Sequence, residues 1–201
     1  ERNEFFNLAK NTANEVINRK AEFGVDLWAT PAELWNPANN RNNKEALYII
    51  SNSTNTALNY DGNGNRLHAW FLTQYNNKPG LTQSIAYGFD GQRRLQPTRY
   101  LLDLFNEQLD ARYNASFQET WIANTTTSGT TAFTWTSAQA TTYGKAASVV
   151  GTPVVSGTNL SLQITKNTVA DKATKPYVVV DRDDLYNADG TIKSLTDFVP
   201  L

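Results

Sequence analysis

Two carboxylates, Asp103 and Glu107, stand four residues apart in a stretch whose apolar residues have helical spacing. On a helix that separation places both side chains on one face, and two acids facing one cleft is what glycoside hydrolysis requires. The same positions also lie opposite the apolar stripe of the stretch, where charged side chains are ordinarily solvated. The solvated-face interpretation is the stronger one, and we expect no catalytic residue in this chain.

A second group of acids lies near the end of the sequence, at Asp181, Asp183, Asp184 and Asp189. Hard cations such as calcium are bound by several carboxylate and carbonyl oxygens. The calcium-loop pattern fails at its third ligand position, where Leu185 stands if Asp181 is first. We expect no metal site and no cofactor, with bound calcium as the alternative; Arg182 could instead pair with one of these acids.

The only histidine is His68, so any histidine-based triad would need it. Its neighbours form the apolar run LHAWF, and a buried histidine satisfied by hydrogen bonds is the better interpretation. The sequence contains no Gly-x-Ser-x-Gly elbow and no glycine-rich phosphate loop. The sequence therefore offers few of the residue combinations that an enzyme active site needs.

Aromatic residues beside asparagines suggest a different chemistry. Sugar rings present flat C–H faces that stack on aromatic side chains, and their hydroxyls pair with neutral amides. Two groupings fit this chemistry, Tyr60 with Asn63 and Trp70 with Tyr75 and Asn76. The alternative is that these aromatics belong to the core and that the asparagines mark turns. We take the five residues as candidate glycan-binding residues.

The composition excludes several classes of partner. The chain has 201 residues, a net charge of −1 and no cysteine. Nucleic-acid binding depends on clustered Lys and Arg, so a nearly neutral chain is not expected to bind DNA or RNA. Disulfides and cysteine-ligated zinc are excluded outright. No apolar run approaches the roughly 20 residues that span a bilayer.

The first half of the sequence predicts helices and one strand. Apolar residues at steps of three and four predict an amphipathic helix over residues 4–20, and Thr30 to Glu33 form a capping box that opens a short helix. The run EALYII at residues 45–50 indicates a buried strand. Residues 67–75 fit either a helix or a strand. A further helix should begin at Thr98, after Pro97.

That central helix carries apolar residues at helical spacing, which we expect to face the core: Tyr100, Leu101, Leu104 and Phe105. After Trp121 the composition shifts to Thr, Ser, Ala and Gly. Alternation at residues 132–136 and 160–164 predicts short strands there, arranged as a small meander. The run YVVVD at 177–181 predicts a late strand, and the turn at 187–190 could lead into a partner strand at Thr191.

The stretch from Gly91 to Trp121 resembles the central motif of the SusD/RagB family, surface lipoproteins of Bacteroidetes that capture glycans and similar nutrients. The elements that carry the resemblance are Gly91, Arg94, Pro97, Thr98, Tyr100, Leu104, Phe105, Asp110, Arg112, Tyr113, Phe117 and Trp121. Weaker similarities lie at residues 40–53 and 176–186. The resemblance implies non-catalytic glycan binding at the outer-membrane surface, for uptake by a SusC-like TonB-dependent transporter. It also implies a lipid anchor outside these residues.

The resemblance further implies an α+β fold, with the helix at 4–20 as the last tetratricopeptide-like repeat helix. We expect a SusD-like helical and loop region at 1–123, an insertion with short strands at 124–176, and a strand–turn segment at 177–201. The chain resembles a middle fragment of a longer protein, since it opens on Glu1 within a helix and contains no Met. The alternative functions are a surface glycoside hydrolase module and an adhesive or structural surface domain.

Overall fold

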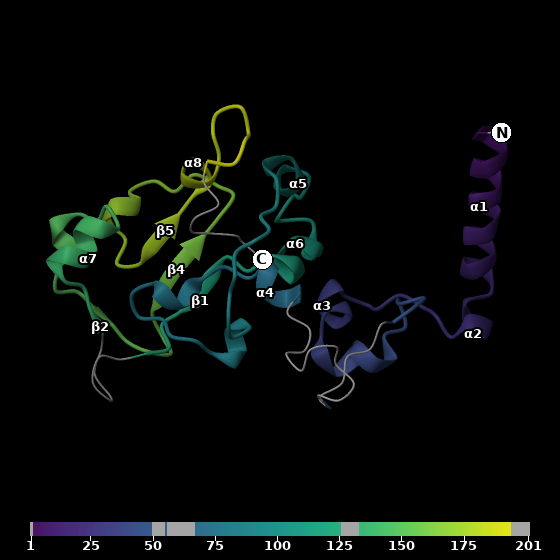
Figure 1. Cartoon of the computed structure of the whole chain (residues 1–201), viewed down its shortest axis with the longest axis horizontal. Coiled ribbons are helices and arrows are strands. Elements are labelled where there is room, and N and C mark those ends of the chain that lie inside the picture. The colour runs from purple at the N-terminus through teal and green to yellow at the C-terminus, as the bar shows by residue number, and fades with distance from the viewer. Residues whose placement is uncertain (1, 50–54, 56–66, 126–132, 194–201) are drawn as a thin grey trace. The chain divides into compact units, whose positions relative to one another are not determined.

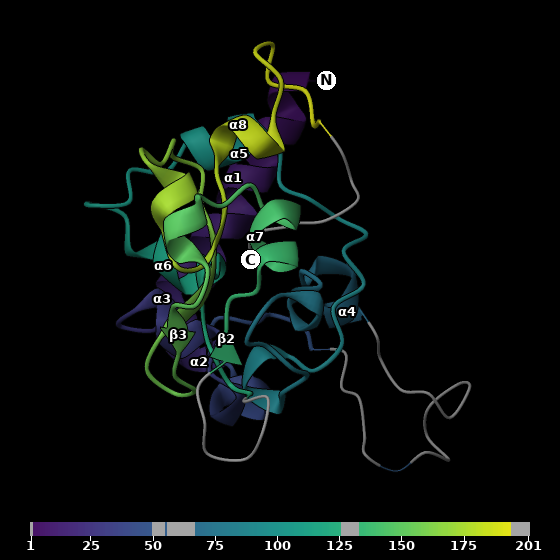
Figure 2. The same cartoon turned by 90° about the vertical axis from the view of Figure 1, so that its left-hand side faces the viewer.

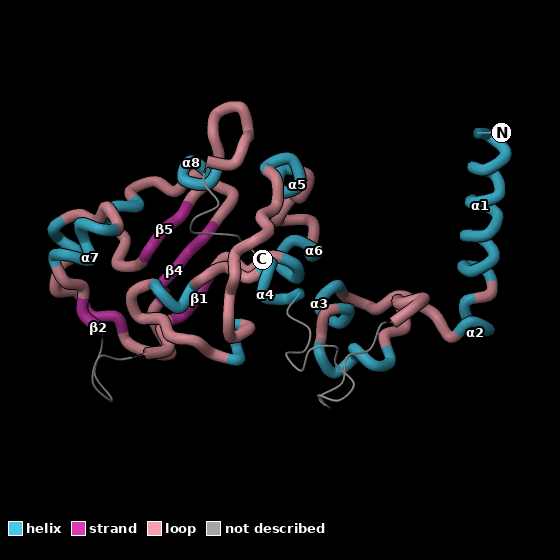
Figure 3. The backbone as a smooth tube through the Cα atoms, in the orientation of Figure 1, coloured by secondary structure: helices cyan, strands magenta, loops and turns pink. Residues whose placement is uncertain are grey.

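The computed structural model describes residues 2–49, 55, 67–125 and 133–193 (Figure 1). The chain divides into two compact units, Glu1–Gly64 and Asn65–Leu201. Both helices and short strands are present, so the predicted α+β class is confirmed. Loops and turns make up much of the second unit, as Figure 3 shows in pink.

The first unit is built from helical elements: α1 (Arg2–Asn18), α2 (Lys20–Phe23), α3 (Pro31–Leu34) and the 3₁₀ helix η1 (Pro37–Asn42). The helix predicted at 4–20 is confirmed by α1 and α2. At the start of α3, the Glu33 carboxylate accepts a hydrogen bond from the Thr30 N–H at 2.9 Å, as the predicted capping box requires. None of the residues of α1 is buried.

The strand predicted at 45–50 is wrong over the residues that are described, 45–49, which form turns and bends. Leu47 and Tyr48 are 74 % and 84 % exposed. The Glu45 carboxylate accepts a hydrogen bond from the Trp28 N–H at 2.6 Å, and this bond holds the segment beside the loop that contains Trp28. An apolar run becomes a strand only where another strand supplies its backbone partners, and the described part of this unit contains none.

The second unit is organised around a three-stranded sheet. Strand β4 (Leu160–Ile164) lies between β1 (Thr120–Ile122), to which it is antiparallel, and β5 (Val178–Val180), to which it is parallel. Figure 1 shows the β4 and β5 arrows side by side. Leu162 pairs with Trp121 on one side and Val178 on the other, and its side chain is completely buried. The strands predicted at 160–164 and 177–181 are confirmed.

The Thr- and Ser-rich segment therefore contributes the central strand of this sheet, and it does not form a separate meander. It also contains a two-stranded sheet of β2 (Phe133–Thr134) and β3 (Pro153–Val154), the helix α7 (Ser137–Thr142) and the 3₁₀ helices η5 (Ala147–Val149) and η6 (Lys172–Thr174). Figure 2 shows this side of the unit, with α7 and β2 facing the viewer. After β5 comes the helix α8 (Arg182–Leu185), and Tyr186 then forms an isolated antiparallel bridge with Ile192, as the predicted turn required.

The segment before the sheet is helical. It contains α4 (Leu67–Phe71), η3 (Tyr75–Asn77), η4 (Ile85–Tyr87), α5 (Arg99–Asp103) and α6 (Ala111–Ser116). The ambiguous run at 67–75 is thus mainly helix. Side chains cap two of these helices: Thr98 accepts from the Leu101 N–H at 3.2 Å, and Asp110 accepts from the Arg112 N–H at 3.0 Å. The predicted helix start at Thr98 is confirmed.

The predicted apolar face of the central helix is wrong. Leu102 is completely buried, whereas Tyr100 and Leu104 are 75 % and 61 % exposed, Leu101 is also exposed, and only Phe105 packs partly against the core. A helix of five residues makes little more than one turn, so its orientation follows the chain on either side of it.

Lys166 fixes that orientation from the end of β4. The residue is 8 % exposed, and its ammonium donates to the carbonyls of Leu102 and Phe105 at 2.9 and 2.7 Å. The Leu102 carbonyl lies at the C-terminal end of α5 and the Phe105 carbonyl just after it, where a positive charge is favourable. A buried lysine therefore joins the sheet to the central motif.

Gly91 provides a test of how closely the motif packs. A Cβ built at this position would lie 2.0 Å from the backbone oxygen of Thr73, and backbone cannot move aside as a flexible side chain can. We expect Gly91→Ala to lower the free energy of unfolding by about 3 kcal/mol, measured by urea denaturation.

The control is Gly144→Ala, where a Cβ would meet nothing within 4 Å and only the positive φ of 60° is strained. That variant should lose about 1 kcal/mol. Equal losses in the two variants would contradict the close approach at Gly91.

Candidate functional site

A hollow of about 370 Å³ lies in the second unit, where four separate segments meet. We name it the amide hollow. The described residues that line it are Asn76, Asn77, Lys78, Pro79, Gly80, Thr125, Phe133, Gln139 and Tyr143. They come from η3 and the turn after it, from the segment that follows β1, from β2, and from α7 and its C-cap residue. Amides, a hydroxyl and aromatic rings predominate, and no acid is among the described lining residues.

Asn76 is the most distinctive lining residue. Its Oδ1 atom is buried and accepts no hydrogen bond. A buried polar atom without a partner costs about 1–3 kcal/mol, so native structures rarely keep one unless a ligand or water completes it. Asn76 itself lines the hollow, whose described walls are mostly neutral and polar.

Asn76 is presented by Tyr75, the residue before it. Tyr75 is 1 % exposed, and its hydroxyl accepts from the Ser84 N–H at 2.8 Å and donates to the Phe89 carbonyl at 3.1 Å. Its ring also packs edge-on against Tyr87, with the ring centroids 5.3 Å apart. Tyr75 therefore anchors η3 in the core, which holds Asn76 at the edge of the hollow.

Gly80 and Asn124 fix the floor of the hollow. Gly80 has a φ of 79°, and a Cβ there would lie 2.7 Å from Ser161 Oγ on the central strand. The Asn124 side chain accepts from the Thr82 N–H at 2.8 Å and donates to the Thr82 carbonyl at 2.9 Å. The turn that follows η3 is thus attached to the end of β1 and lies against β4.

Aromatic side chains and α7 form another wall. Trp135 is 2 % exposed, and the rings of Phe133 and Tyr143 meet it edge-on at 6.2 and 6.1 Å. The Trp135 indole N–H donates to the Pro176 carbonyl at 2.9 Å, which fixes the cluster. Gln139 lies at the third position of α7, where its Oε1 accepts from the Thr136 N–H in a capping box.

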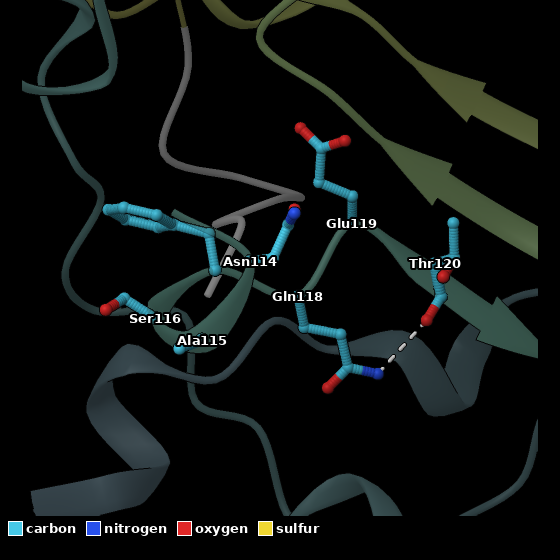
Figure 4. A pocket seen from close by; sticks show the side chains of 7 residues that line it. Asn114, Ala115, Ser116, Gln118, Glu119 and Thr120 are labelled. Carbon is cyan, nitrogen blue, oxygen red and sulfur yellow. Dashed lines mark hydrogen bonds between the residues drawn. The ribbon is translucent and has the colours of Figure 1, made fainter. Parts of the chain in front are cut away.

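A second hollow, of about 680 Å³, lies beside the connection between α6 and β1 (Figure 4). Its described lining is the single stretch from Asn114 to Thr120. In Figure 4 the Gln118 amide donates to the Thr120 carbonyl, a bond of 3.2 Å. The acid in this stretch, Glu119, accepts a hydrogen bond from the buried Tyr113 hydroxyl. Burial, followed by this bond, raises the pKa of Tyr113 far above its ordinary value. We call this the α6–β1 hollow.

Of the five residues predicted to bind a glycan, three lie in the described part of the structure. Tyr60 and Asn63 lie outside the described residues. Trp70, on α4, is 43 % exposed but is not among the residues that line either hollow. Tyr75 is in the core, so its ring faces are not open for stacking, and only Asn76 lines the amide hollow.

Sequence reasoning missed Phe133, Gln139 and Tyr143, which complete the hollow from a segment that we expected only to form strands. One local signal was present: Thr136 to Gln139 is a capping box, and it predicts the helix that carries Gln139 and brings Tyr143 to its end.

The two carboxylates considered for hydrolysis are held in ion pairs. Both oxygens of Asp103 accept from the Arg182 guanidinium, at 3.1 and 2.9 Å. Glu107 lies 3.3 Å from the Lys166 ammonium and also accepts from the Asn167 amide. Acids in such pairs stabilise contacts between segments, and the geometry gives no support to the hydrolase alternative. His68 lies on α4, and its side chain is outside the described part of the structure.

The acids near the end of the chain do not converge on one point. Asp181 is 1 % exposed and caps α8, and Lys172 lies 3.0 Å from it and 2.9 Å from Asp184. Asp189 instead accepts from the N–H and hydroxyl of Thr191. No cluster of three or more His, Cys, Asp or Glu side chains that could hold a metal occurs among the described residues.

Comparison with known proteins gave no relative. No family model, no curated protein and no solved structure matches this chain. The similarity to the SusD/RagB motif therefore stays a prediction from the residues quoted for it. Within the described residues, no helix is both long enough and apolar enough to span a membrane.

Asp181 yields a prediction for the dependence of stability on pH. Burial alone raises its pKa, but hydrogen bonds from the Val169 N–H and the Lys172 ammonium outweigh burial, so the pKa lies below its ordinary value of 3.8. The stabilisation is therefore fully present only well above the ordinary pKa of 3.8, and it is lost as the pH falls through the folded-state pKa. Asp181→Asn should lose about 3 kcal/mol of unfolding free energy at pH 7.

The difference between wild type and Asp181→Asn should shrink as the pH falls below about 4, because the unfolded chain then binds a proton that the folded carboxylate takes up only at lower pH. Asp183→Asn removes the same charge from an exposed side chain of α8 and should lose less than 1 kcal/mol, on the order expected of a surface change. Urea denaturation at pH 7 and pH 3 measures both. A difference that stays constant with pH would contradict the account.

Proposed function

We propose that this chain binds a glycan in the amide hollow without transforming it. The observation that carries the proposal is the buried, unpartnered Oδ1 of Asn76 at the edge of a hollow lined by amides and aromatic rings. A sugar hydroxyl is a neutral donor that would satisfy this atom. The paired state of Asp103 and Glu107 fits binding better than hydrolysis.

The lining also fits the two faces of a sugar ring. The amides of Asn76 and Asn77 supply donors and acceptors for hydroxyls, while the partly buried Tyr143 offers apolar surface for C–H groups. Small-ligand sites commonly combine an apolar wall with a few fixed polar groups. The exposed indole of Trp70 is a second stacking surface in this proposal.

The cellular setting in the proposal comes from the sequence resemblance. The parent protein would be held at the outer-membrane surface by a lipid anchor outside these residues. It would pass the glycan to a SusC-like TonB-dependent transporter, which is the proposed protein partner. The affinity of each site would be modest, since each hydroxyl exchanges water for a neutral hydrogen bond.

The test is a tryptophan-fluorescence titration of the folded chain with soluble starch, dextran, xylan and galacturonan. Trp135 contacts two lining residues, Phe133 and Tyr143, so its emission should report an occupied hollow. Asn76→Ala should weaken saturable binding about fivefold by removing one neutral hydrogen bond. Its unfolding free energy should not fall, because the deleted oxygen has no partner in the free protein.

Gln118→Ala is the matched control, since it removes an amide from the α6–β1 hollow and should leave the affinity unchanged. If Gln118→Ala weakens binding and Asn76→Ala does not, the glycan binds in the α6–β1 hollow and its assignment to the amide hollow is wrong. A folded chain that binds none of the four polysaccharides would favour the adhesive or structural alternative.

A further inference from the structure

Strand β1 lies at an edge of the three-stranded sheet. Among the described strands it pairs with β4 alone. The Glu119 carbonyl accepts a hydrogen bond from the β4 backbone, and the Ala123 N–H donates to the residue just before β4, both at 2.8 Å. Because successive residues of a strand direct their backbone groups to opposite sides, those of Thr120 and Ile122 point outward, away from β4.

One hydroxyl binds both outward groups of Ile122. The Tyr87 hydroxyl accepts from the Ile122 N–H and donates to the Ile122 carbonyl, each at 3.0 Å. The neighbouring outward carbonyl, that of Thr120, accepts from the Gln118 side-chain amide at 3.2 Å (Figure 4). Side chains therefore occupy positions that the backbone of another strand would take.

The short helix η4 holds Tyr87 at this edge. The Ser84 hydroxyl caps η4 by accepting from the Ala86 N–H at 3.2 Å, and Gly88 ends it with a φ of 76°. The Tyr87 ring packs edge-on against the buried Tyr75, with the ring centroids 5.3 Å apart. The Tyr75 hydroxyl in turn accepts from the Ser84 N–H at 2.8 Å. The core thus fixes where the Tyr87 hydroxyl lies.

An open strand edge is a template for pairing with another chain, and native proteins cover or charge such edges. We propose that the outer edge of β1 is a pairing surface for a second copy of this chain, and that the Tyr87 hydroxyl keeps it closed. This inference is independent of glycan binding.

A second copy fits this edge because the pair is isologous, with the same groups supplied by both strands. In an antiparallel pair of β1 strands centred on Trp121, the Ile122 groups of each copy meet the Thr120 groups of the other. The Tyr87 hydroxyl uses the same Ile122 groups, so the hydroxyl and a second strand exclude each other.

Tyr87→Phe removes the hydroxyl and keeps the ring that packs on Tyr75. Sedimentation velocity over about a hundredfold range of concentration should show a monomer–dimer equilibrium for this variant. Its self-association should be about a hundredfold tighter than that of the wild type, roughly tenfold for the hydroxyl lost from each copy. Hydrogen exchange of the Ile122 amide should be faster than in the wild type when the variant is dilute, and should slow as it is concentrated.

Two further variants separate edge pairing from a general loss of stability. Tyr186→Phe removes a buried hydroxyl that donates to the Pro97 carbonyl, outside β1, at 2.6 Å, and it should associate no more than the wild type. Adding Thr120→Pro to Tyr87→Phe should restore wild-type behaviour, because proline lacks the N–H that a second strand needs and is tolerated at a strand edge. Thermal melts confirm that each variant is folded.

A folded Tyr87→Phe variant that associates no more than the wild type overturns the proposal. Equal association of Tyr186→Phe also overturns it, because destabilisation would then be the cause. A dimer that persists with Thr120→Pro would place the contact elsewhere. If the Thr120→Pro combination does not fold, the Ile122 amide decides: exchange that does not slow as Tyr87→Phe is concentrated contradicts pairing at this edge.

Discussion

The pairing of strand β4 with two partners is the constraint on which the second unit depends. Leu162 pairs with Trp121 on β1 and with Val178 on β5, which joins three segments distant in the sequence. At one end of β4, the Lys166 ammonium binds the carbonyls of α5. At the other end, Ser161 lies beneath Gly80, which allows the turn after η3 to approach the sheet. Both the central motif and the amide hollow are thus positioned by one strand.

Local interactions were predictable from sequence, because the residues that make them are neighbours. The caps at Thr30 and Thr98 follow from hydroxyl groups just before a helix. Strand β5 was evident as a β-branched run. The run at 45–50 misled because a strand also needs a partner, and no residue type reveals whether one is present.

The candidate site was harder to predict, since it depends on which distant segments meet. Tyr75 and Asn76 are adjacent, yet one is buried in the core and the other lines the hollow, a distinction that composition does not make. Gln139 and Tyr143 arrive from a segment more than sixty positions later. The residue types predicted a surface of amides and aromatic rings, and the topology decides which of these side chains come together.

The most direct test of a glycan site in the amide hollow is an NMR titration that follows side-chain amide signals. The probes are oligomers of the same four polysaccharides. The account predicts saturable shifts in the NH₂ signals of Asn76, Asn77 and Gln139, with the signals of Asn114 and Gln118 unchanged. Shifts confined to Asn114 and Gln118 would contradict it, because the ligand would then occupy the α6–β1 hollow.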